Sequence, residues 1–211
     1  MMMTDGLLKN LMRGKTLIMQ SGNTDLERNL FIESVTDATV FRDFRCGIEK
    51  MDEFIHRGLV LSVESNYCKL YKVSREEEIV ALFALSFDSL ILDSDDKTEL
   101  KQEDRISVDS KYEEMFWSKR HYPALEIAYL AVRDDLRGSD IGSFLIDSIA
   151  EMAVSQKLAG CQFLTVEALS KAKEGALDYS ATAFYFKNHF SACELPNPNK
   201  DTLRMYRPLY P

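Results

Sequence analysis

The chain has 211 residues, of which 45% are hydrophobic, 28% charged and 10% aromatic. These proportions are close to the averages for globular proteins, so they exclude collagen-like and intrinsically disordered chains, and a chain of this length forms one domain by default. The formal net charge is −8, from 26 Lys and Arg against 34 Asp and Glu. This balance disfavours a broad nucleic-acid-binding surface.

The sequence also bears on the compartment. No apolar run approaches the roughly 20 residues that span a bilayer, and Lys, Arg and Gly interrupt the apolar stretch of the first 20 residues, which is poor for a signal peptide. We therefore expect a cytoplasmic protein with no membrane partner. The cysteines lie far apart without a CxxC pair, at Cys46, Cys68, Cys161 and Cys193, and no two histidines stand at metal-ligand spacing. This pattern favours buried thiols over disulfides or a metal site.

The first third of the chain predicts a strand and a helix. Residues 5–13 favour a short helix, residues 21–23 a loop, and residues 34–44 a strand. Apolar residues then recur at helical spacing, which predicts an amphipathic helix over residues 47–65. The recurring residues are Ile48, Met51, Phe54, Ile55 and Leu59.

A β-hairpin and a charged insertion follow. Residues 68–73 alternate between apolar and polar, residues 75–78 form a charged turn, and residues 79–85 are almost wholly apolar, which together predict a hairpin. Residues 93–120 break this pattern. Their charge run is typical of a solvated face, with at most one helix, near residues 112–117.

The second half alternates strands and helices. Residues 122–132 form the clearest strand, followed by a loop and a helix whose apolar face is Ile141, Phe144, Leu145, Ile149, Met152 and Ala153. Ser148 interrupts that face but is small enough to lie against a neighbouring element. A strand over 161–168, a helix over 182–189 and a strand over 202–209 complete a single mixed α/β or α+β domain.

The junction between the clearest strand and its helix carries the strongest chemical signal. The strand ends at Val132, and a glycine-bearing loop opens into the helix near Ile141. Such a junction directs free backbone N–H groups and the positive helix end toward one point, which suits a pyrophosphate. Gly138 and Gly142 would allow a close approach of the backbone. An ordinary turn remains the alternative at this stage.

This segment resembles motif A of the GNAT superfamily of N-acetyltransferases, Arg/Gln-x-x-Gly-x-Gly/Ala after a Leu-Ala-Val strand. Further segments follow in the family's order: FRCGIEKMDEFI (44–55), IVALFALSFDSL (79–90), FLTVEAL (163–169), ATAFYFKNHF (181–190) and LRMYRPL (203–209). The first two resemble the branch that includes toxin-type acetyltransferases. The resemblance implies a mixed, mostly antiparallel central sheet flanked by helices, over residues 34–211 with the insertion at 93–120, after an extension of residues 1–33.

The resemblance also implies an acetyl-CoA site. It assigns the pantetheine arm and the acetyl oxygen to the strand residues Leu130, Ala131 and Val132. It assigns the pyrophosphate to Arg137, Gly138, Ser139, Asp140, Ile141, Gly142 and Ser143. Asp140 departs from the motif because a glycine is expected there, and we interpret it as a helix cap. His189 likewise replaces a usual glycine.

Two residues are candidates for acid–base catalysis. Tyr185 matches the family's tyrosine, and a phenol with a pKa of about 10 can donate a proton to a leaving thiolate with a pKa of about 8.5. Its alternative is a core aromatic beside Phe184 and Phe186. Glu126 lies inside an apolar strand and is the candidate base, with an exposed strand residue as its alternative. Tyr129 is a further candidate, which either lines the acceptor side of the site or packs against neighbouring residues.

The function implied by the resemblance is acetyl-CoA-dependent transfer to a primary amine of a small molecule or protein, by direct attack and without a metal. The alternatives are a toxin-type acetyltransferase acting on aminoacyl-tRNA and a non-catalytic CoA-binding sensor. The toxins' Gly-Arg before Leu-Ala-Val is here Ala128-Tyr129, and the chain is acidic. We therefore expect an amine acceptor and no nucleic-acid partner, and a homodimer stays open.

Overall fold

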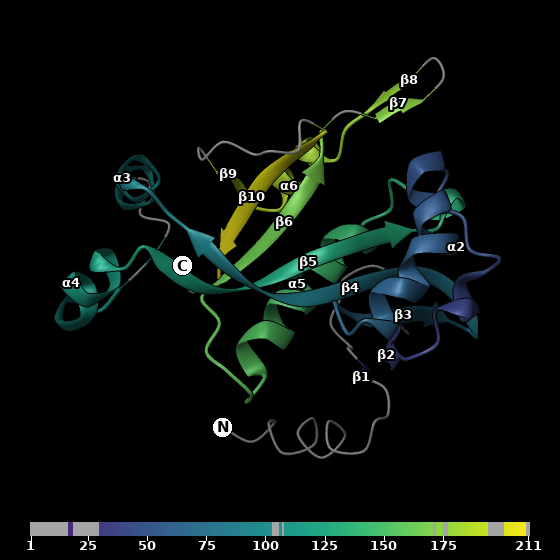
Figure 1. Cartoon of the computed structure of the whole chain (residues 1–211), viewed down its shortest axis with the longest axis horizontal. Helices are drawn as coiled ribbons and strands as arrows, with labels where there is room; N and C mark the ends of the chain where they lie inside the picture. Colours follow the sequence, from purple (N-terminus) through teal and green to yellow (C-terminus); the bar gives the residue numbers. More distant parts are fainter. Residues whose placement is uncertain are drawn as a thin grey trace. The chain divides into compact units, whose positions relative to one another are not determined.

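The computed structural model describes residues 17–18, 30–102, 106, 108–170, 172–174, 177–193 and 201–209. Figure 1 shows the helices and strands coloured in chain order. The chain divides into two compact units. Unit 1 consists of Met1–Ser86 and Ala128–Ser148, and unit 2 of Phe87–Ile127 and Ile149–Pro211. The predicted short helix at 5–13 and loop at 21–23 lie outside the described residues. The division into an extension of residues 1–33 and a domain of residues 34–211 stays a prediction.

The strands hydrogen-bond in the order β1-β2-β3-β4-β5-β6-β10-β9, and β7 and β8 form a separate pair. β5 and β6 are parallel, whereas the β1–β2, β2–β3, β3–β4, β6–β10 and β9–β10 pairs are antiparallel. The predicted mixed, mostly antiparallel sheet is thus confirmed. The strands are β1 (Leu17–Ile18), β2 (Phe31–Val35), β3 (Lys69–Arg75), β4 (Glu78–Ile91), β5 (His121–Val132), β6 (Phe163–Leu169), β7 (Ala172–Glu174), β8 (Leu177–Tyr179), β9 (Ser191–Ala192) and β10 (Thr202–Pro208).

Five α-helices and two 3₁₀ helices are described. They are η2 (Ala38–Phe41), α2 (Glu49–Glu64), α3 (Ser94–Gln102), α4 (Ser110–Ser118), η3 (Asp134–Leu136), α5 (Ile141–Ser155) and α6 (Thr182–Lys187). The predicted helices at 47–65, 141–153 and 182–189 are confirmed as α2, α5 and α6. In α5 the hydroxyl of Ser148 donates to the carbonyl of Phe144 at 2.8 Å, and the residue is buried as expected.

The strand predicted over residues 34–44 is wrong for most of its length. β2 ends at Val35, and η2 begins at Ala38. The side chain of Asp37 accepts a hydrogen bond from the backbone N–H of Thr39 at 2.8 Å. Aspartate at this position caps a helical turn and so competes with a continued strand.

The predicted β3–β4 hairpin is confirmed. Its two connecting residues, Glu76 and Glu77, have φ of 50° and 73°. Positive φ at both central residues is the feature of a type I′ turn, whose twist matches that of the paired strands. Within β4, residues 80–85 are all buried, as an apolar run of this length in a central strand predicts.

The insertion at 93–120 contains two helices, α3 and α4, so the prediction of at most one helix is wrong. Asp93 Oδ1 accepts from the N–H groups of Asp95 and Asp96 at 2.8 and 2.9 Å, and Asp96 Oδ2 accepts from Asp93 N–H at 3.1 Å. This reciprocal arrangement is that of a capping box, so part of the charge run starts a helix.

The insertion also contributes to the core of unit 2. Leu100 of α3 and Phe116 of α4 are buried in a cluster with residues from the strands and their ends: Leu90, Leu92, Tyr122, Ala124, Phe163, Cys193 and Tyr206. The side chains of Ile106, Val108 and Trp117 pack against this cluster. The interpretation of the insertion as only a solvated face is therefore wrong.

The four cysteines all lie in the described part of the chain, none of them forms a disulfide, and three are buried. Among the described residues, no helix is long and apolar enough to cross a membrane. The β7–β8 pair and β9 were not predicted from the sequence. They are two or three residues long, too short for an alternating pattern to stand out.

Candidate active site

The predicted cofactor-binding segment lies in unit 1, where β5 leads into α5. After Val132 the chain forms η3 and a turn, and α5 begins at Ile141. The carbonyl of Asp140 accepts from the N–H of Phe144 at 2.9 Å, which places Asp140 at the N-cap position. Gly138 has φ of 78°, and a Cβ built on it meets no atom within 4 Å. The backbone at Gly138 is therefore accessible at the turn before the helix.

Arginine ion pairs fix the shape of this turn. Arg133 donates to Asp135 at 2.6 Å and to Glu78 at 3.0 Å, and these hydrogen bonds raise its pKa above the usual value. Arg137 lies on the turn itself, with its Nη1 3.7 Å from Asp134 and its side chain 38% exposed. Arg133 thus has a structural role, whereas Arg137 is the more exposed cation beside Gly138.

The FRCG segment packs directly against the turn. The N–H of Asp134 donates to the carbonyl of Arg45 at 3.0 Å, and a Cβ on Gly47 would lie 2.2 Å from Asp134 Oδ1. Gly47 also has φ of 78°, so its backbone conformation favours glycine, and a side chain there would displace the Asp134 carboxylate. Burial raises the pKa of the Cys46 thiol to about 12, which is unsuitable for a thiolate nucleophile.

Tyr129, the candidate for the acceptor side, stacks on Phe54 of α2, with ring centroids 4.1 Å apart and an interplanar angle of 19°. A Cβ on Gly58 would lie 2.4 Å from the Phe54 ring, so the glycine makes room for it. Both rings are half-buried. The structure thus gives Tyr129 a packing partner on α2, and a contact with the acceptor stays a prediction.

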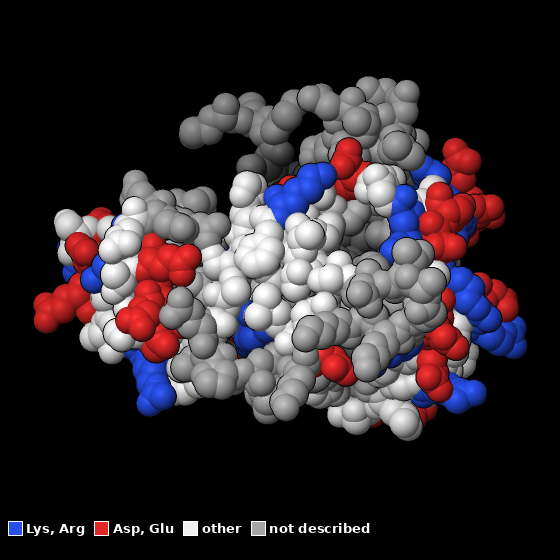
Figure 2. All heavy atoms as spheres, turned by 90° about the horizontal axis from the view of Figure 1, so that it is seen from above, with Lys and Arg blue, Asp and Glu red and all other residues white. Residues whose placement is uncertain are grey.

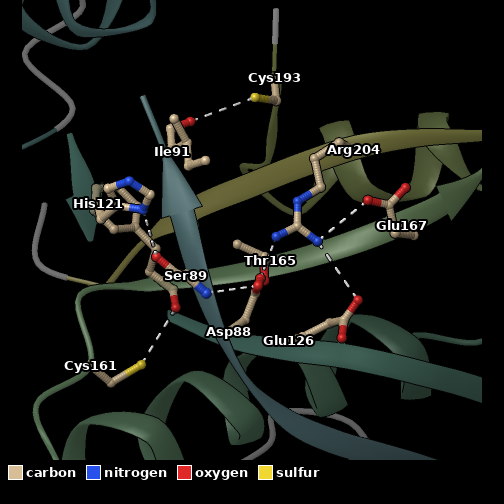
Figure 3. Close-up of polar contacts among 11 residues, drawn as sticks. Asp88, Ser89, Ile91, His121, Glu126, Cys161, Thr165, Glu167, Cys193 and Arg204 are labelled. Atoms are coloured by element: carbon tan, nitrogen blue, oxygen red, sulfur yellow. Dashed lines mark hydrogen bonds and ion pairs between the residues drawn. The ribbon is translucent and has the colours of Figure 1, made fainter. Parts of the chain in front are cut away.

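The candidate base Glu126 lies in unit 2, within a row of charged side chains on one sheet face (Figure 3). Arg204 of β10 is central to this row. Its Nη1 lies 3.7 Å from Glu126 Oε1 and 3.4 Å from Glu167 Oε1, and its Nη2 contacts Asp88 Oδ2. Asp88 also accepts from the buried Thr165 hydroxyl, and Glu167 from Thr202 Oγ1 at 2.9 Å.

Side chains along a β-strand alternate between the two faces of the sheet, which explains why these side chains meet. Residues two apart on a strand share a face, so Tyr122, Ala124 and Glu126 point to the same side of β5. The same holds for Phe163, Thr165 and Glu167 on β6. This face of unit 2 is therefore apolar at one end, where Leu100 and Phe116 cover it, and charged at the other.

Glu126 was predicted as the candidate base, with an exposed strand residue as its alternative, and the structure gives it an ion-pair partner in Arg204. Glu126 and Arg204 are only 15% and 19% exposed, so this pair is partly withdrawn from water. Arg204 and Asp88 were not predicted as site residues. The signal available for both was a charged residue within a strand, but nothing local indicated their pairing.

Tyr185 lies on α6 and is 6% exposed. Its ring packs edge-to-face against Phe184 and Phe190, with centroids 5.1 and 5.2 Å apart. Phe186, the expected neighbour, is instead 49% exposed. These contacts support the alternative that Tyr185 is a core aromatic residue, and its role as a proton donor stays a prediction. His189 follows α6 with φ of 65°, which explains why a glycine is usual at that position.

One hollow among the described residues lies outside the predicted site. A hollow of about 370 Å³ in unit 2 lies beside α4, lined mainly by apolar side chains that include Tyr112, Phe116 and Phe163. None of the predicted site residues lines it. Within the described part of the chain, no group of three or more His, Cys, Asp or Glu residues is arranged to hold a metal ion.

No protein-family model matches the chain, and no curated protein matches it. Solved structures do match. AtaT complexed with acetyl-methionyl-tRNAfMet is 21% identical, with a TM-score of 0.56 over 83% of this chain and 94% of that one. A Tyr-to-Phe mutant of KacT is 19% identical, with a TM-score of 0.57 over 86% and 96%. The chain has the fold of these proteins.

A third structure is a Tyr-to-Phe mutant of the AtaT toxin bound to the C-terminus of the antitoxin AtaR and acetyl-CoA. It is 19% identical, with a TM-score of 0.56 over 86% of this chain and 94% of that one. These likenesses confirm the resemblance at the level of the fold. The shared fold is therefore one basis for assigning roles to the residues of this chain.

Proposed function

We propose that the protein is an acetyl-CoA-dependent N-acetyltransferase that acetylates the amino group of aminoacyl-tRNA. The observation that carries the proposal is the junction of β5 and α5. It combines an accessible left-handed Gly138, the start of a 15-residue helix and an exposed Arg137. It does so in the fold of a toxin that was crystallised with acetyl-CoA.

The residues of this junction suit the pyrophosphate of acetyl-CoA. The first N–H groups of a helix have no intrahelical acceptors and face an anion at its N-terminus. Arg137 adds a positive charge beside Gly138, and no side chain occupies the space above that glycine. Leu130, Ala131 and Val132 would extend the site by offering strand backbone groups to the pantetheine arm.

The reaction would need little more than positioning and two proton transfers. The acceptor nitrogen attacks the thioester carbonyl carbon and forms the new bond between nitrogen and the acetyl group. The carbon–sulfur bond then breaks and releases CoA as the thiolate. In this proposal Tyr185 donates a proton to the departing CoA thiolate. Glu126 takes the surplus proton of the acceptor nitrogen.

The comparison favours aminoacyl-tRNA over the small amine or protein amine expected from the sequence. That expectation relied on Ala128-Tyr129 in place of the toxins' Gly-Arg, on the acidic chain and on the negative charge of the insertion. Several of its carboxylates are used within the insertion: Asp93 and Asp96 in the capping box, and Asp109 in a cap and an ion pair with Lys111. Figure 2 shows acidic and basic side chains together toward the right of the face it displays, whereas acidic side chains predominate toward the left. The net charge of −8 therefore does not describe every part of the surface, and it is a weak argument against a polyanionic acceptor.

A cationic small-molecule or protein amine is the second candidate acceptor. The row of Asp88, Glu126 and Glu167, with side chains 15–38% exposed, favours it because three carboxylates there face one guanidinium. Such a row attracts an ammonium group by charge complementarity.

Acetyl transfer from labelled acetyl-CoA distinguishes the two acceptors. The purified protein is incubated with a charged tRNA pool, the same pool after deacylation, and a panel of polyamines and lysine peptides. We expect label on charged tRNA only, released with the amino acid on mild alkaline hydrolysis. Label on the amines alone would establish the second candidate instead. Absence of transfer to every acceptor would refute an acetyltransferase acting on either class.

A protein partner follows from the same comparison. AtaT was solved with its antitoxin, and a KacTA complex was solved with DNA. We propose that this chain also has an antitoxin partner. Induced expression should then arrest growth, and co-expression of a gene adjacent to its own should restore growth.

A further inference from the structure

We propose that Arg204 is a positioning residue that holds the carboxylate of Glu126 in place for proton transfer. This inference rests on the proposed function, in which Glu126 accepts the proton of the attacking amine. The starting observation is that one guanidinium contacts carboxylates from three other strands: Asp88 of β4, Glu126 of β5 and Glu167 of β6 (Figure 3).

The guanidinium is itself fixed from two sides. On one side Nη2 contacts Asp88, whose carboxylate is held by the Ser89 N–H at 2.7 Å and by the Thr165 hydroxyl. On the other side Nη1 contacts Glu167, which accepts from Thr202 at 2.9 Å. Because both anchors have donors of their own, Arg204 cannot turn away from Glu126 without breaking several polar contacts. The orientation of Glu126 is thereby linked to a network across four strands.

Arginine suits this task better than lysine. Its guanidinium is planar and directs N–H groups along several fixed directions, so two nitrogens can serve different carboxylates at once. A lysine ammonium is a single point charge on a flexible stem. It could pair with Asp88 or with Glu126 but would not hold both.

Burial makes the arrangement more than a surface ion pair. The side chains of Arg204, Asp88 and Glu126 are 19%, 20% and 15% exposed. Exposed ion pairs contribute little because water and salt screen them, whereas partly buried pairs are screened much less. Removing Arg204 would leave Asp88, Glu126 and Glu167 facing one another. Their mutual repulsion would reorient Glu126.

A double-mutant cycle between Arg204→Met and Glu126→Gln tests this inference. If Arg204 acts through Glu126, Arg204→Met should lower kcat by up to about 100-fold, the loss expected when a catalytic group is misplaced by about 1 Å. The KM for acetyl-CoA should stay nearly unchanged. The double mutant should be no slower than Glu126→Gln alone, since residues acting as a unit are not additive. Arg204→Lys should recover only part of kcat.

The split between kcat and KM separates positioning from a structural role. Arg204→Met should lower kcat and leave the KM for acetyl-CoA nearly unchanged, and this effect should vanish in the Glu126→Gln background. The matched control is Lys72→Met, which removes the cation of another strand-borne ion pair, Lys72–Glu33 at 3.1 Å. This control should leave both kcat and KM unchanged.

The outcomes distinguish the inference from the proposed function. A wild-type protein that transfers acetyl to no acceptor would refute the proposed function and the inference with it. Active wild type with additive losses in the cycle, or with a raised KM and an unchanged kcat in Arg204→Met, would overturn the positioning role alone. Nonadditive losses confined to kcat would establish it.

Discussion

The turn of unit 1 and the charged row of unit 2 are built in opposite ways. The turn at 133–140 is closed mainly by contacts within a few residues, such as Arg133 to Asp135 and Ser139 to Leu136. The row joins residues 37, 77 and 116 positions apart in the chain. The first presents backbone groups, and the second presents side-chain charges. Local sequence patterns therefore find the turn readily and leave most of the row unseen.

The difference also separates what each region could do. A backbone cradle tolerates many side chains and depends on a few glycines, whereas a charge row depends on every member, because a missing partner leaves a partly buried charge. Binding of an anionic cofactor should thus fail when a glycine of the turn is replaced by a residue with a side chain. Proton transfer should fail when a single polar group is removed.

The largest effect is expected in unit 2 at Tyr185. Replacing Tyr185 with Phe removes one hydroxyl and keeps the ring contacts with Phe184 and Phe190. If that hydroxyl protonates the thiolate, kcat should fall by about 10²–10⁴-fold, the usual contribution of general acid catalysis. The KM for acetyl-CoA and the melting temperature should change little, as steady-state kinetics and calorimetry would measure.

Tyr122→Phe is the matched control for Tyr185→Phe. The Tyr122 hydroxyl donates to the carbonyls of Phe116 at 2.8 Å and Lys119 at 3.1 Å. Its loss should lower the free energy of unfolding by about 1 kcal/mol and spare kcat. A Tyr185→Phe protein with wild-type kcat in the same assay would return Tyr185 to a purely packing role.

The next effect is expected in unit 1, where Gly138→Asp would place a negative side chain in the space above the turn. At a hundredfold excess over Kd, acetyl-CoA should stabilise the wild-type protein by about 2.7 kcal/mol. Gly138→Asp should abolish this shift, because the new carboxylate would repel the pyrophosphate. Thermal unfolding with and without acetyl-CoA measures it.

Gly160→Asp is the control for the Gly138 variant. A Cβ on Gly160 also meets no atom within 4 Å, and its φ is outside the left-handed range. It therefore adds the same charge to open space away from the motif. Equal loss of the acetyl-CoA shift in both variants would mean that charge in general, and not the turn, governs binding.

The sequence predicted most of the elements but not the partners of its functional side chains. The strand ending at Val132, the helix starting at Ile141 and the hairpin turn at Glu76-Glu77 follow from local periodicity and composition. The ion pair of Glu126 with Arg204 depends on the order of four strands, which no local pattern encodes. The insertion was misjudged because Asp93 and Asp96 look solvated in sequence, whereas in the structure they cap α3.

Alkaline unfolding compares the two units through one group in each. Burial raises the pKa of Cys46 in unit 1 from its usual 9.0 to about 12, and that of Tyr122 in unit 2 from 10.0 to about 12. Both raised values favour the neutral folded form. Their stabilisation is fully present below pH 9 and is lost as the pH rises toward 12, with a slope of up to about 1.4 kcal/mol per pH unit for each proton.

The two contributions separate by pH. Of these two groups, Cys46 alone contributes between pH 9 and 10, where Cys161, whose pKa burial also raises, adds to the decline. Cys46→Ala should therefore reduce the slope there. Tyr122→Phe should flatten it only above pH 10. Urea unfolding at half-unit steps from pH 8 to 11 gives both slopes. A decline that neither substitution alters would assign alkaline sensitivity to other groups.

The smallest effect is expected at the helix ends, where the units can be compared directly. His189 follows α6 in unit 2 with φ of 65°, and Asn66 follows α2 in unit 1 with φ of 56°. Left-handed backbone is more strained for histidine than for asparagine, whose short polar side chain can form a local hydrogen bond. His189→Gly should therefore raise the free energy of unfolding by up to about 1 kcal/mol, reduced by the extra chain entropy that glycine gives the unfolded state. Asn66→Gly should be close to neutral, because it relieves less strain for the same entropic loss.

Denaturant unfolding of both variants measures the difference in the free energy of unfolding, which should favour His189→Gly. Equal effects would mean that the histidine carries no excess strain, and that the departure from the family's glycine is compensated by contacts of the His189 side chain.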